Sequence, residues 1–266
     1  MFCTQCLFRE KNMLNSHIQM PKLLLKNFQN RYNHLCYYDV SKQLIGTKGS
    51  AKSINTEYGY YSENTEKYLE QQIETPFSNI LKYLDEIGVA DKKIVPVRTN
   101  ITEVIFDLMY SLVARSPSFH EMINESDSFL SQLPKEEKRD YIIKTGINTS
   151  RENSIFSEYI VTFMFNKTDV PFVLSMNGIY NYILNGNNVV NLPITPKIAI
   201  CLIHKNYASR IINDDGSISM FEITNPKDIM TMNRRAFSFQ VIHGWGYIVC
   251  PEKTELERLV EIFNQN

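Results

Sequence analysis

Long apolar runs, an excess of one charge and a cysteine framework are all missing from this chain of 266 residues. No apolar run approaches the roughly 20 residues that a membrane-spanning helix needs, so the sequence predicts no membrane span. Lys and Arg number 28 against 29 Asp and Glu, which leaves a formal charge of -1. No global field therefore draws the chain toward nucleic acid or membrane, although a local basic patch stays open.

The five cysteines are scattered and odd in number, which is unlike the framework of a disulfide-stabilised secreted domain. We expect most of them to be reduced. The first residues place Arg9, Glu10 and Lys11 after a short apolar stretch, which is the wrong order for a signal peptide. The sequence therefore predicts a cytoplasmic protein with no membrane partner.

Four common catalytic motifs are also absent: Gly-x-x-x-x-Gly-Lys-Ser/Thr, Gly-x-Gly-x-x-Gly, His-Glu-x-x-His and Gly-x-Ser-x-Gly. Their absence argues against the common nucleotide-binding sites, zinc proteases and serine hydrolases, and leaves other enzyme classes open. The chain has no internal repeats, low-complexity tracts or linkers rich in Pro, Gly or Ser. We therefore expect an irregular lead-in at residues 1–15 and a single α+β domain at 16–266.

Apolar material for a core is ample, because 43% of the residues are hydrophobic and 12% are aromatic. Helical spacing dominates until about residue 165, and short β-prone runs follow. The sequence predicts an α+β fold whose helical N-terminal and central part packs on a C-terminal mixed or antiparallel sheet. Helices are expected at 21–29, 65–88, 100–116, 119–132, 135–147, 152–165, 226–236 and 252–264, a hairpin-like segment at 34–54, and strands at 172–175, 198–203, 239–242 and 247–250.

The helix expected from Asn100 has clear start and stop signals. Asn100 can cap it, and Glu103, three residues later, completes a pair like that of a capping box. Pro117 ends the run of helical spacing. The sequence thus predicts an N-terminal cap made by the side chain of Asn100.

Cys3 and Cys6 are separated by two residues, which is half of a zinc signature. His34 and Cys36 are candidates for the other two ligands, since a structural zinc site needs four. Because no second tight cysteine pair completes the set, we predict that Cys3 and Cys6 bind no metal.

The segment Gly46-Thr-Lys-Gly49 imitates the Gly-x-x-Gly loop with which KH modules clamp a nucleic-acid backbone. That module needs a helix on both sides of the loop, whereas a β-prone segment precedes this one. A hairpin turn is therefore favoured. Lys42, Lys48 and Lys52 still form a small basic patch, which either contacts phosphate or solvates the loop, so nucleic acid remains a possible partner.

Glu66, Glu70 and Glu74 recur every four residues and so lie near one another on a single helix face. Carboxylates at that spacing can share a divalent cation or place a general base beside an acid. The alternative is a solvated helix face. Glu74 differs from the other two because it lies beside the apolar stripe of its helix, where a carboxylate needs a partner.

The segment from His17 to Pro21, followed by an apolar helix that ends at Phe28, resembles the opening of a bacterial family known as domain of unknown function four-two-three-eight. Further similar features follow in order, so that the resemblance covers about residues 16–250. These features are Tyr60-Tyr61, Ile73-Glu74, Arg115-Ser-Pro117, Leu192-Pro-Ile-Thr-Pro196 and Asn233.

One departure from the family pattern concerns an acidic residue. Where members of the family often have Thr-Ser-Asp-x-Pro, this chain has Leu174-Ser-Met-Asn-Gly178. Met176 thus stands in the acidic position, with Asn177 beside it. If that carboxylate is catalytic in the family, this protein is impaired or uses another group.

The resemblance implies no settled activity, but its polar residues suit chemistry. His17 can act as an acid, a base or a metal ligand, Glu74 can orient it, and Arg115 can hold a phosphate. On this hypothesis the three are catalytic, a divalent metal is an open cofactor, and the protein is a nuclease or phosphoesterase in phage defence or bacterial conflict. On the alternative, His17 pins the first helix, Arg115 pairs with Glu74 in a buried network, and the protein is a non-enzymatic binding or regulatory module.

Overall fold

The computed structural model describes residues 15–87, 93–95, 100–126, 130–153, 156–184 and 187–265, in which helices and strands are mixed, as the sequence predicts. The helical elements are α1 (Lys22–Asn27), α2 (Glu63–Leu69), the π-helical turn η1 (Glu70–Glu74), α3 (Thr75–Ile87), α5 (Ile101–Ala114), α6 (Pro117–Ser126), η2 (Leu130–Gln132), α7 (Lys135–Glu152), η3 (Lys205–Arg210), α8 (Pro226–Ile242) and α9 (Lys253–Asn264). The strands are β1 (Asn15–His17), β2 (Leu35–Asp39), β3 (Leu44–Gly49), β4 (Thr56–Tyr58), β5 (Lys93–Ile94), β6 (Tyr159–Asn166), β7 (Leu174–Ser175), β8 (Tyr180–Leu184), β9 (Asn187–Pro193), β10 (Ile198–His204), β11 (Ile218–Ser219), β12 (Phe221–Ile223) and β13 (Tyr247–Cys250).

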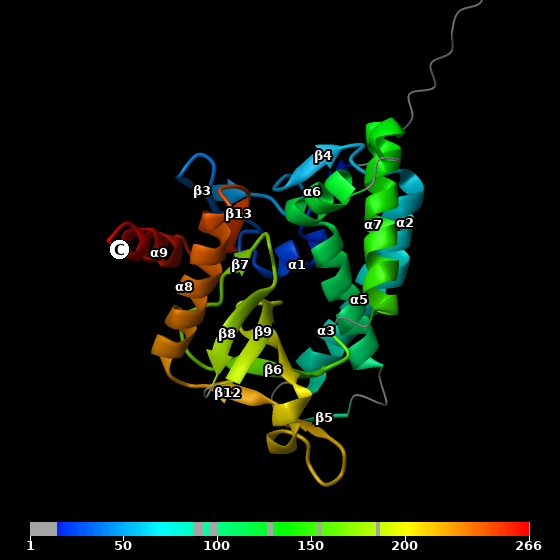
Figure 1. The fold of residues 1–266 in the computed structure, drawn as a ribbon. Helices are drawn as coiled ribbons and strands as arrows, with labels where there is room; N and C mark the ends of the chain where they lie inside the picture. Colours follow the sequence, from blue (N-terminus) through cyan, green and yellow to red (C-terminus); the bar gives the residue numbers. More distant parts are fainter. Residues whose placement is uncertain are drawn as a thin grey trace, which may run out of the picture.

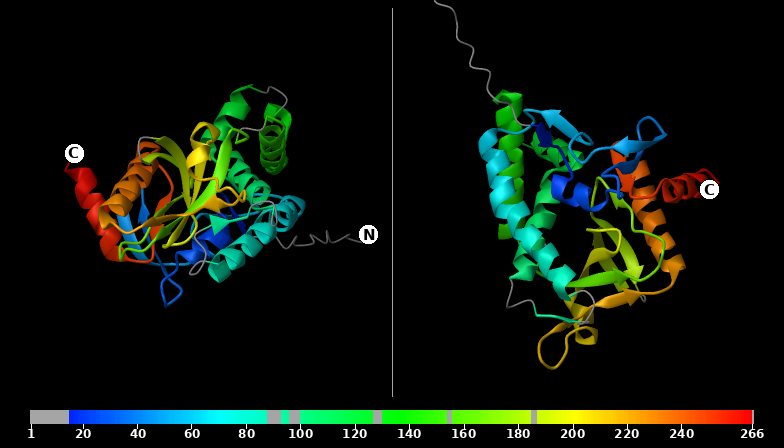
Figure 2. Two further views of the ribbon diagram at one scale, coloured as in Figure 1. Left: turned by 90° about the horizontal axis from the view of Figure 1, so that it is seen from below. Right: turned by 180° about the vertical axis from the view of Figure 1, so that it is seen from behind.

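Most of the strands belong to two larger sheets. A five-stranded sheet has the order β12-β6-β10-β9-β8, in which β12 runs parallel to β6 and the other neighbours are antiparallel. A four-stranded sheet has the order β3-β2-β13-β7 and pairs strands from the two halves of the chain. Helices α2, α3, α5, α6 and α7 gather on one side of these strands, and α8 and α9 lie on the other (Figure 1). The views from below and from behind show the same division (Figure 2).

The first long helical run follows the apolar stripe that the sequence predicts, although a π-helical turn interrupts it between α2 and α3. The hydroxyl of Ser62 accepts a hydrogen bond from the Thr65 backbone N–H at 3.3 Å and so caps the start of the run. Buried side chains recur at intervals of three or four residues, which turns one face to the core. They are Leu69, Ile73, Phe77, Ile80 and Leu84.

Three local predictions are wrong. Residues 152–165 do not form a helix, because α7 ends at Glu152 and β6 starts at Tyr159. Residues 239–242 are the last turn of α8 and not a strand. Asn100 precedes α5, but it has a left-handed backbone with φ of 48° and its side chain makes no capping hydrogen bond.

The hairpin-like segment predicted at 34–54 is confirmed, because β2 and β3 pair in antiparallel register. The prediction of a turn at Gly46-Thr-Lys-Gly49 is wrong, because these residues lie within β3. A Cβ atom at Gly46 would lie 2.2 Å from the ring of Tyr37, and one at Gly49 would lie 2.8 Å from it. The two glycines therefore make room for this tyrosine ring across the strand. Their spacing is thus explained by packing, without a nucleic-acid clamp. Among the residues described, no helix has the length and apolar character needed to cross a membrane.

Candidate functional site

The structure places the three predicted catalytic residues on separate elements. His17 is the last residue of β1, where its backbone lies opposite Thr56. Its side chain falls outside what the structure describes. Glu74 ends the π-helical turn η1, and Arg115 directly follows the last residue of α5. Catalytic roles for the three residues remain a prediction.

Glu74 and Arg115 form an ion pair, as the structural alternative predicts. An Nη atom of Arg115 donates to Oε1 of Glu74 at 3.0 Å. The Arg115 side chain is only 2% exposed, whereas that of Glu74 is 24% exposed. A buried guanidinium needs such a partner, because an unpaired charge away from water is costly. The pair ties the first helical run to the end of α5.

The backbone next to His17 contacts Tyr61, which lies close to Arg115 of the ion pair. The hydroxyl of Tyr61 donates to the carbonyl of Ile18 at 3.2 Å. Burial raises the pKa of Tyr61, and the positive charge of Arg115 partly counteracts that rise. The segment that carries His17 is therefore held beside Tyr61, which lies close to the buried ion pair.

A histidine that the sequence analysis did not select lies on α6. His120 is partly buried, and burial lowers its pKa to about 4 while a hydrogen bond with the Ala114 backbone opposes the shift. Its Nε2 atom is buried without a partner among the described residues. Arg139, which lies over the ring of Tyr60 at 3.6 Å, also disfavours its protonation. His120 is thus neutral near pH 7.

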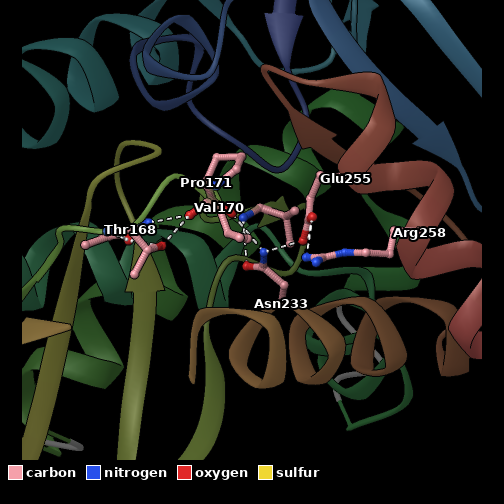
Figure 3. A network of polar contacts seen from close by, with 8 residues as sticks. Thr168, Val170, Pro171, Asn233, Glu255 and Arg258 are labelled. Atoms are coloured by element: carbon pink, nitrogen blue, oxygen red, sulfur yellow. Dashed lines mark hydrogen bonds and ion pairs between the residues drawn. The ribbon is translucent and has the colours of Figure 1, made fainter. Parts of the chain in front are cut away.

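Asn233, one of the residues that carry the family resemblance, is the centre of a buried polar network (Figure 3). Its Oδ1 accepts from the Val173 backbone N–H at 3.1 Å, and its Nδ2 donates to the Pro171 carbonyl and to Glu255, both at 2.8 Å. Arg258 donates to the second oxygen of Glu255 at 2.5 Å. Asn233 therefore joins α8, α9 and the segment before β7, which is a structural role.

A cleft of about 610 Å³ lies between the end of α5, the start of α6, the β7–β8 connection and the C-terminal half of α8. The hydroxyl-bearing residues Ser116 and Ser118 line one wall. Asn177 and Tyr180 line the base, and each has a buried polar atom, Nδ2 and Oη respectively, with no partner in the described part of the chain. Unpaired buried donors of this kind cost about 1–3 kcal/mol each.

The opposite wall of the cleft is formed by α8 and the residue after it. Arg235 lies here, and it forms no ion pair with any residue that the structure describes. Phe239 and Ile242 expose 41% and 79% of their surface. His243 packs edge-on against Phe239, with ring centroids 4.9 Å apart. The wall thus combines one cation with apolar and aromatic surface.

The departure from the family pattern lies at this cleft. Asn177 lines it, and the neighbouring Met176 is buried against Gly246. The backbone N–H of Asn177 donates to Gln240 of α8 at 2.9 Å. The sequence analysis selected this position, but it missed Arg235 because one arginine on a predicted helix carries no motif.

No Asp or Glu side chain lines the cleft within the described ranges. Those ranges also contain no group of three or more His, Cys, Asp or Glu side chains that could hold a metal ion. Cys3 and Cys6 lie outside the described residues. No family model, curated protein or solved structure matches the chain. The family resemblance therefore remains a prediction, and the function has to be argued from the cleft.

Proposed function

We propose that this protein binds a phosphate ester with an aromatic or apolar group, such as a nucleotide or the end of a nucleic-acid strand, in the cleft between α5, α6, β8 and α8. The observation that carries the proposal is the guanidinium of Arg235 at the cleft wall, without an ion-pair partner among the described residues. Arginine binds phosphate with two parallel charge-assisted hydrogen bonds.

The rest of the cleft suits the other parts of such a ligand. Phe239 offers an exposed ring on which a base can stack, a contact worth about 1–3 kcal/mol per base. Ser118 offers a hydroxyl donor for a phosphate oxygen, whereas the hydroxyl of Ser116 already donates to the Val113 carbonyl at 2.8 Å. The cleft volume of about 610 Å³ lies within the roughly 300–1,000 Å³ of small-molecule sites.

A non-enzymatic binding or regulatory module is the function that these features support best. The two predicted catalytic residues with described side chains, Glu74 and Arg115, are paired with each other, and neither lines the cleft. This proposal includes the arrangement expected from the sequence, with N-terminal and central helices packed on the C-terminal sheet. The contact between α5 and β6 supports that arrangement.

A hydrolase, either a nuclease or a phosphoesterase in phage defence or bacterial conflict, is the second candidate. It is favoured by one observation: Ser118, which carries a hydroxyl, lines the same cleft as His243. A hydroxyl nucleophile and a histidine base are the group types that phosphoryl transfer through a covalent intermediate uses.

The only tryptophan of the chain gives a direct binding assay. The ring of Trp245 lies 6.3 Å from that of His243, so a ligand in the cleft should change its fluorescence. We would titrate the protein with the four ribonucleoside monophosphates and with short single-stranded oligonucleotides. Saturable change with at least one of them is the expected result, and no change with any of them would contradict the proposal.

Arg235→Gln and Arg234→Gln form a matched pair for this assay, because the two arginines are neighbours on α8 and Arg234 faces a different pocket, between α8 and α9. Loss of a charge-assisted contact of about 1.5–3 kcal/mol predicts that Arg235→Gln weakens binding about 10- to 100-fold. Arg234→Gln should stay within about twofold of the wild type. Equal losses in both variants would point to a diffuse charge effect and against a site at Arg235.

The hydrolase candidate is tested by following the bound ligand. The wild type and His243→Ala would be incubated with the ligand identified by fluorescence, with and without added Mg²⁺, and the products separated by chromatography. Turnover that disappears in His243→Ala supports a hydrolase. An unchanged ligand after prolonged incubation at high protein concentration leaves the binding module as the function.

A further inference from the structure

Two cysteines that are far apart in the sequence lie directly opposite each other in the four-stranded sheet. Cys36 of β2 and Cys250 of β13 are register partners in an antiparallel pair. Both side chains are buried, and both thiols are free. The third described cysteine, Cys201, lies opposite Asn191 and Thr162 and so faces no second thiol in its register.

The distance between these strands suits a disulfide. The backbone N–H of Val40 donates to the Gly246 carbonyl at 3.0 Å, and hydrogen-bonded pairs recur at every second residue. Cys36 and Cys250, four residues along in the same register, therefore form another hydrogen-bonded pair, with Cα atoms about 5.5 Å apart. Disulfides span about 4.4–6.8 Å between Cα atoms.

The bond would nevertheless be strained. Cβ atoms of opposed residues are about 4.5–5.5 Å apart, whereas the mean in disulfides is about 3.8 Å. The two strands have to approach each other slightly for the bond to form. Strained disulfides are more easily reduced than relaxed ones, so this bond would be reversible.

The two thiols differ in their surroundings. The sulfur of Cys36 lies 3.6 Å from the Pro251 carbonyl, at the start of α9. Burial raises the pKa of Cys36, and the positive charge of Lys253 partly counteracts that rise. Cys250 is completely buried, and burial raises its pKa, although a hydrogen bond with the Glu252 backbone partly counteracts that rise. Because Cys36 keeps 5% of its surface exposed and Cys250 keeps none, Cys36 is the thiol that an oxidant reaches first.

The geometry points to an oxidative modification site, in which a low-molecular-weight disulfide such as oxidised glutathione converts Cys36 and Cys250 into a reversible cross-strand disulfide. The Cys36 thiolate attacks one sulfur of the oxidant and releases one glutathione thiolate, which takes up a proton. The Cys250 thiol then loses its proton to solvent and attacks the Cys36 sulfur, releasing the second glutathione. Two protein thiols are oxidised, and one glutathione disulfide is reduced to two glutathione molecules.

Oxidation would fasten two distant parts of the chain together. The bond would link the hairpin of β2 and β3 to β13, and so close a long loop between residues 36 and 250. Because a closed loop reduces the entropy of the unfolded chain, the oxidised form should melt at a higher temperature, by on the order of 10 °C. Reduction would return the melting temperature to its original value.

The test uses the full chain with Cys3→Ser and Cys6→Ser, which removes the other closely spaced cysteine pair and leaves three of the five cysteines. The folded protein is incubated with oxidised glutathione, its remaining thiols are blocked, and its peptides are mapped by mass spectrometry. We expect a linked peptide that joins Cys36 to Cys250, loss of two titratable thiols and recovery of both after dithiothreitol. Cys201 should remain a thiol.

Single variants distinguish the pair from nonspecific oxidation. Cys250→Ala should stop at a mixed disulfide between glutathione and Cys36, whereas Cys201→Ala should still form the internal bond. If Cys250→Ala unfolds, the peptide map of the protein with Cys3→Ser and Cys6→Ser decides alone. Three intact thiols after an incubation that oxidises the urea-unfolded protein would overturn the proposal. A link that involves Cys201, or a melting temperature that falls on oxidation, would also overturn it.

Discussion

The buried ion pair of Glu74 and Arg115 and the cleft beside α8 each contain an arginine, and the two guanidinium groups lie in opposite surroundings. In the ion pair, the guanidinium of Arg115 is 2% exposed and donates to a carboxylate at 3.0 Å. In the cleft, the guanidinium of Arg235 is exposed and forms no ion pair with any described residue. Arg115 therefore already has a carboxylate partner, whereas Arg235 can still bind an anionic ligand.

This difference separates residues that hold the fold from residues that can bind. A buried charge with one partner contributes to stability mainly because removal of that partner would leave the other unpaired. An exposed cation contributes little to stability, so a change there affects binding more than folding. Substitutions at the ion pair should therefore change the free energy of unfolding, whereas substitutions in the cleft should change ligand affinity.

The largest effect is expected at the ion pair. Arg115→Ala should lower the free energy of unfolding by about 3–5 kcal/mol, because Glu74 would be left without its cation. Urea denaturation with the wild type alongside measures this. The control is Lys67→Ala, because the side chains of Lys67 and its partner Glu63 are 58% and 65% exposed, and loss of such a surface pair should cost about 1 kcal/mol or less. Equal losses in the two variants would contradict the structural role of Arg115.

The second largest effect should come from Asn233. Asn233→Ala leaves the Val173 N–H, the Pro171 carbonyl and one oxygen of Glu255 without this partner. Buried polar groups without partners cost about 1–3 kcal/mol each, and partial relaxation suggests a total of about 3 kcal/mol. Thermal melting measures the change. A loss below about 1 kcal/mol would show that water replaces the amide without cost.

His120 should make stability depend on pH. Its pKa is lowered to about 4 in the folded protein from about 6.5 in an unfolded chain, so between these values the unfolded state binds more protons. Stability is therefore full above about pH 6.5 and is lost as the pH falls toward 4. The loss between pH 7 and pH 5 should be roughly 2 kcal/mol.

The comparison that tests this is between His120→Asn and His243→Asn, each melted from about pH 5 to 7.5. His120→Asn should have a flatter profile than the wild type, because it lacks the titrating group. His243→Asn, in the cleft, should follow the wild type. The same slope in all three proteins would exclude His120 as the source of the pH dependence.

The smallest stability effect is expected at His17. His17→Ala should stay within about 0.5 kcal/mol of the wild type if the imidazole is free for chemistry. Under the catalytic hypothesis, activity would disappear in this variant while the melting curve stayed nearly the same. A large drop in melting temperature would instead assign His17 to the structural network of the first helix.

The fold could be predicted where one apolar face dominates. The stripe from Leu69 to Leu84 recurs at helical spacing, and the structure has a helical run there. The prediction was wrong at Tyr159–Asn166, because most of that strand is buried on both faces and its sequence does not alternate. It was also wrong at 239–242, where the β-prone residues continue a helix that starts at Pro226.

The candidate site could be predicted only in part. Glu74 was expected to need a partner because it lies beside an apolar stripe, and Arg115 provides one. The cleft was missed because Ser116, Asn177 and Arg235 come from three separate segments. Sequence spacing relates residues within one element, and it does not show which faces of distant elements meet.

The pairing of β2 with β13 has a consequence during synthesis. When β2 and β3 leave the ribosome they form a hairpin in which the β2 edge is unpaired, because β13, the strand that covers that edge, is made much later. At roughly 5–20 residues per second, the intervening chain takes on the order of ten seconds to be made. During that interval the edge is exposed to other nascent chains, and a chaperone that binds it would protect the protein from aggregation.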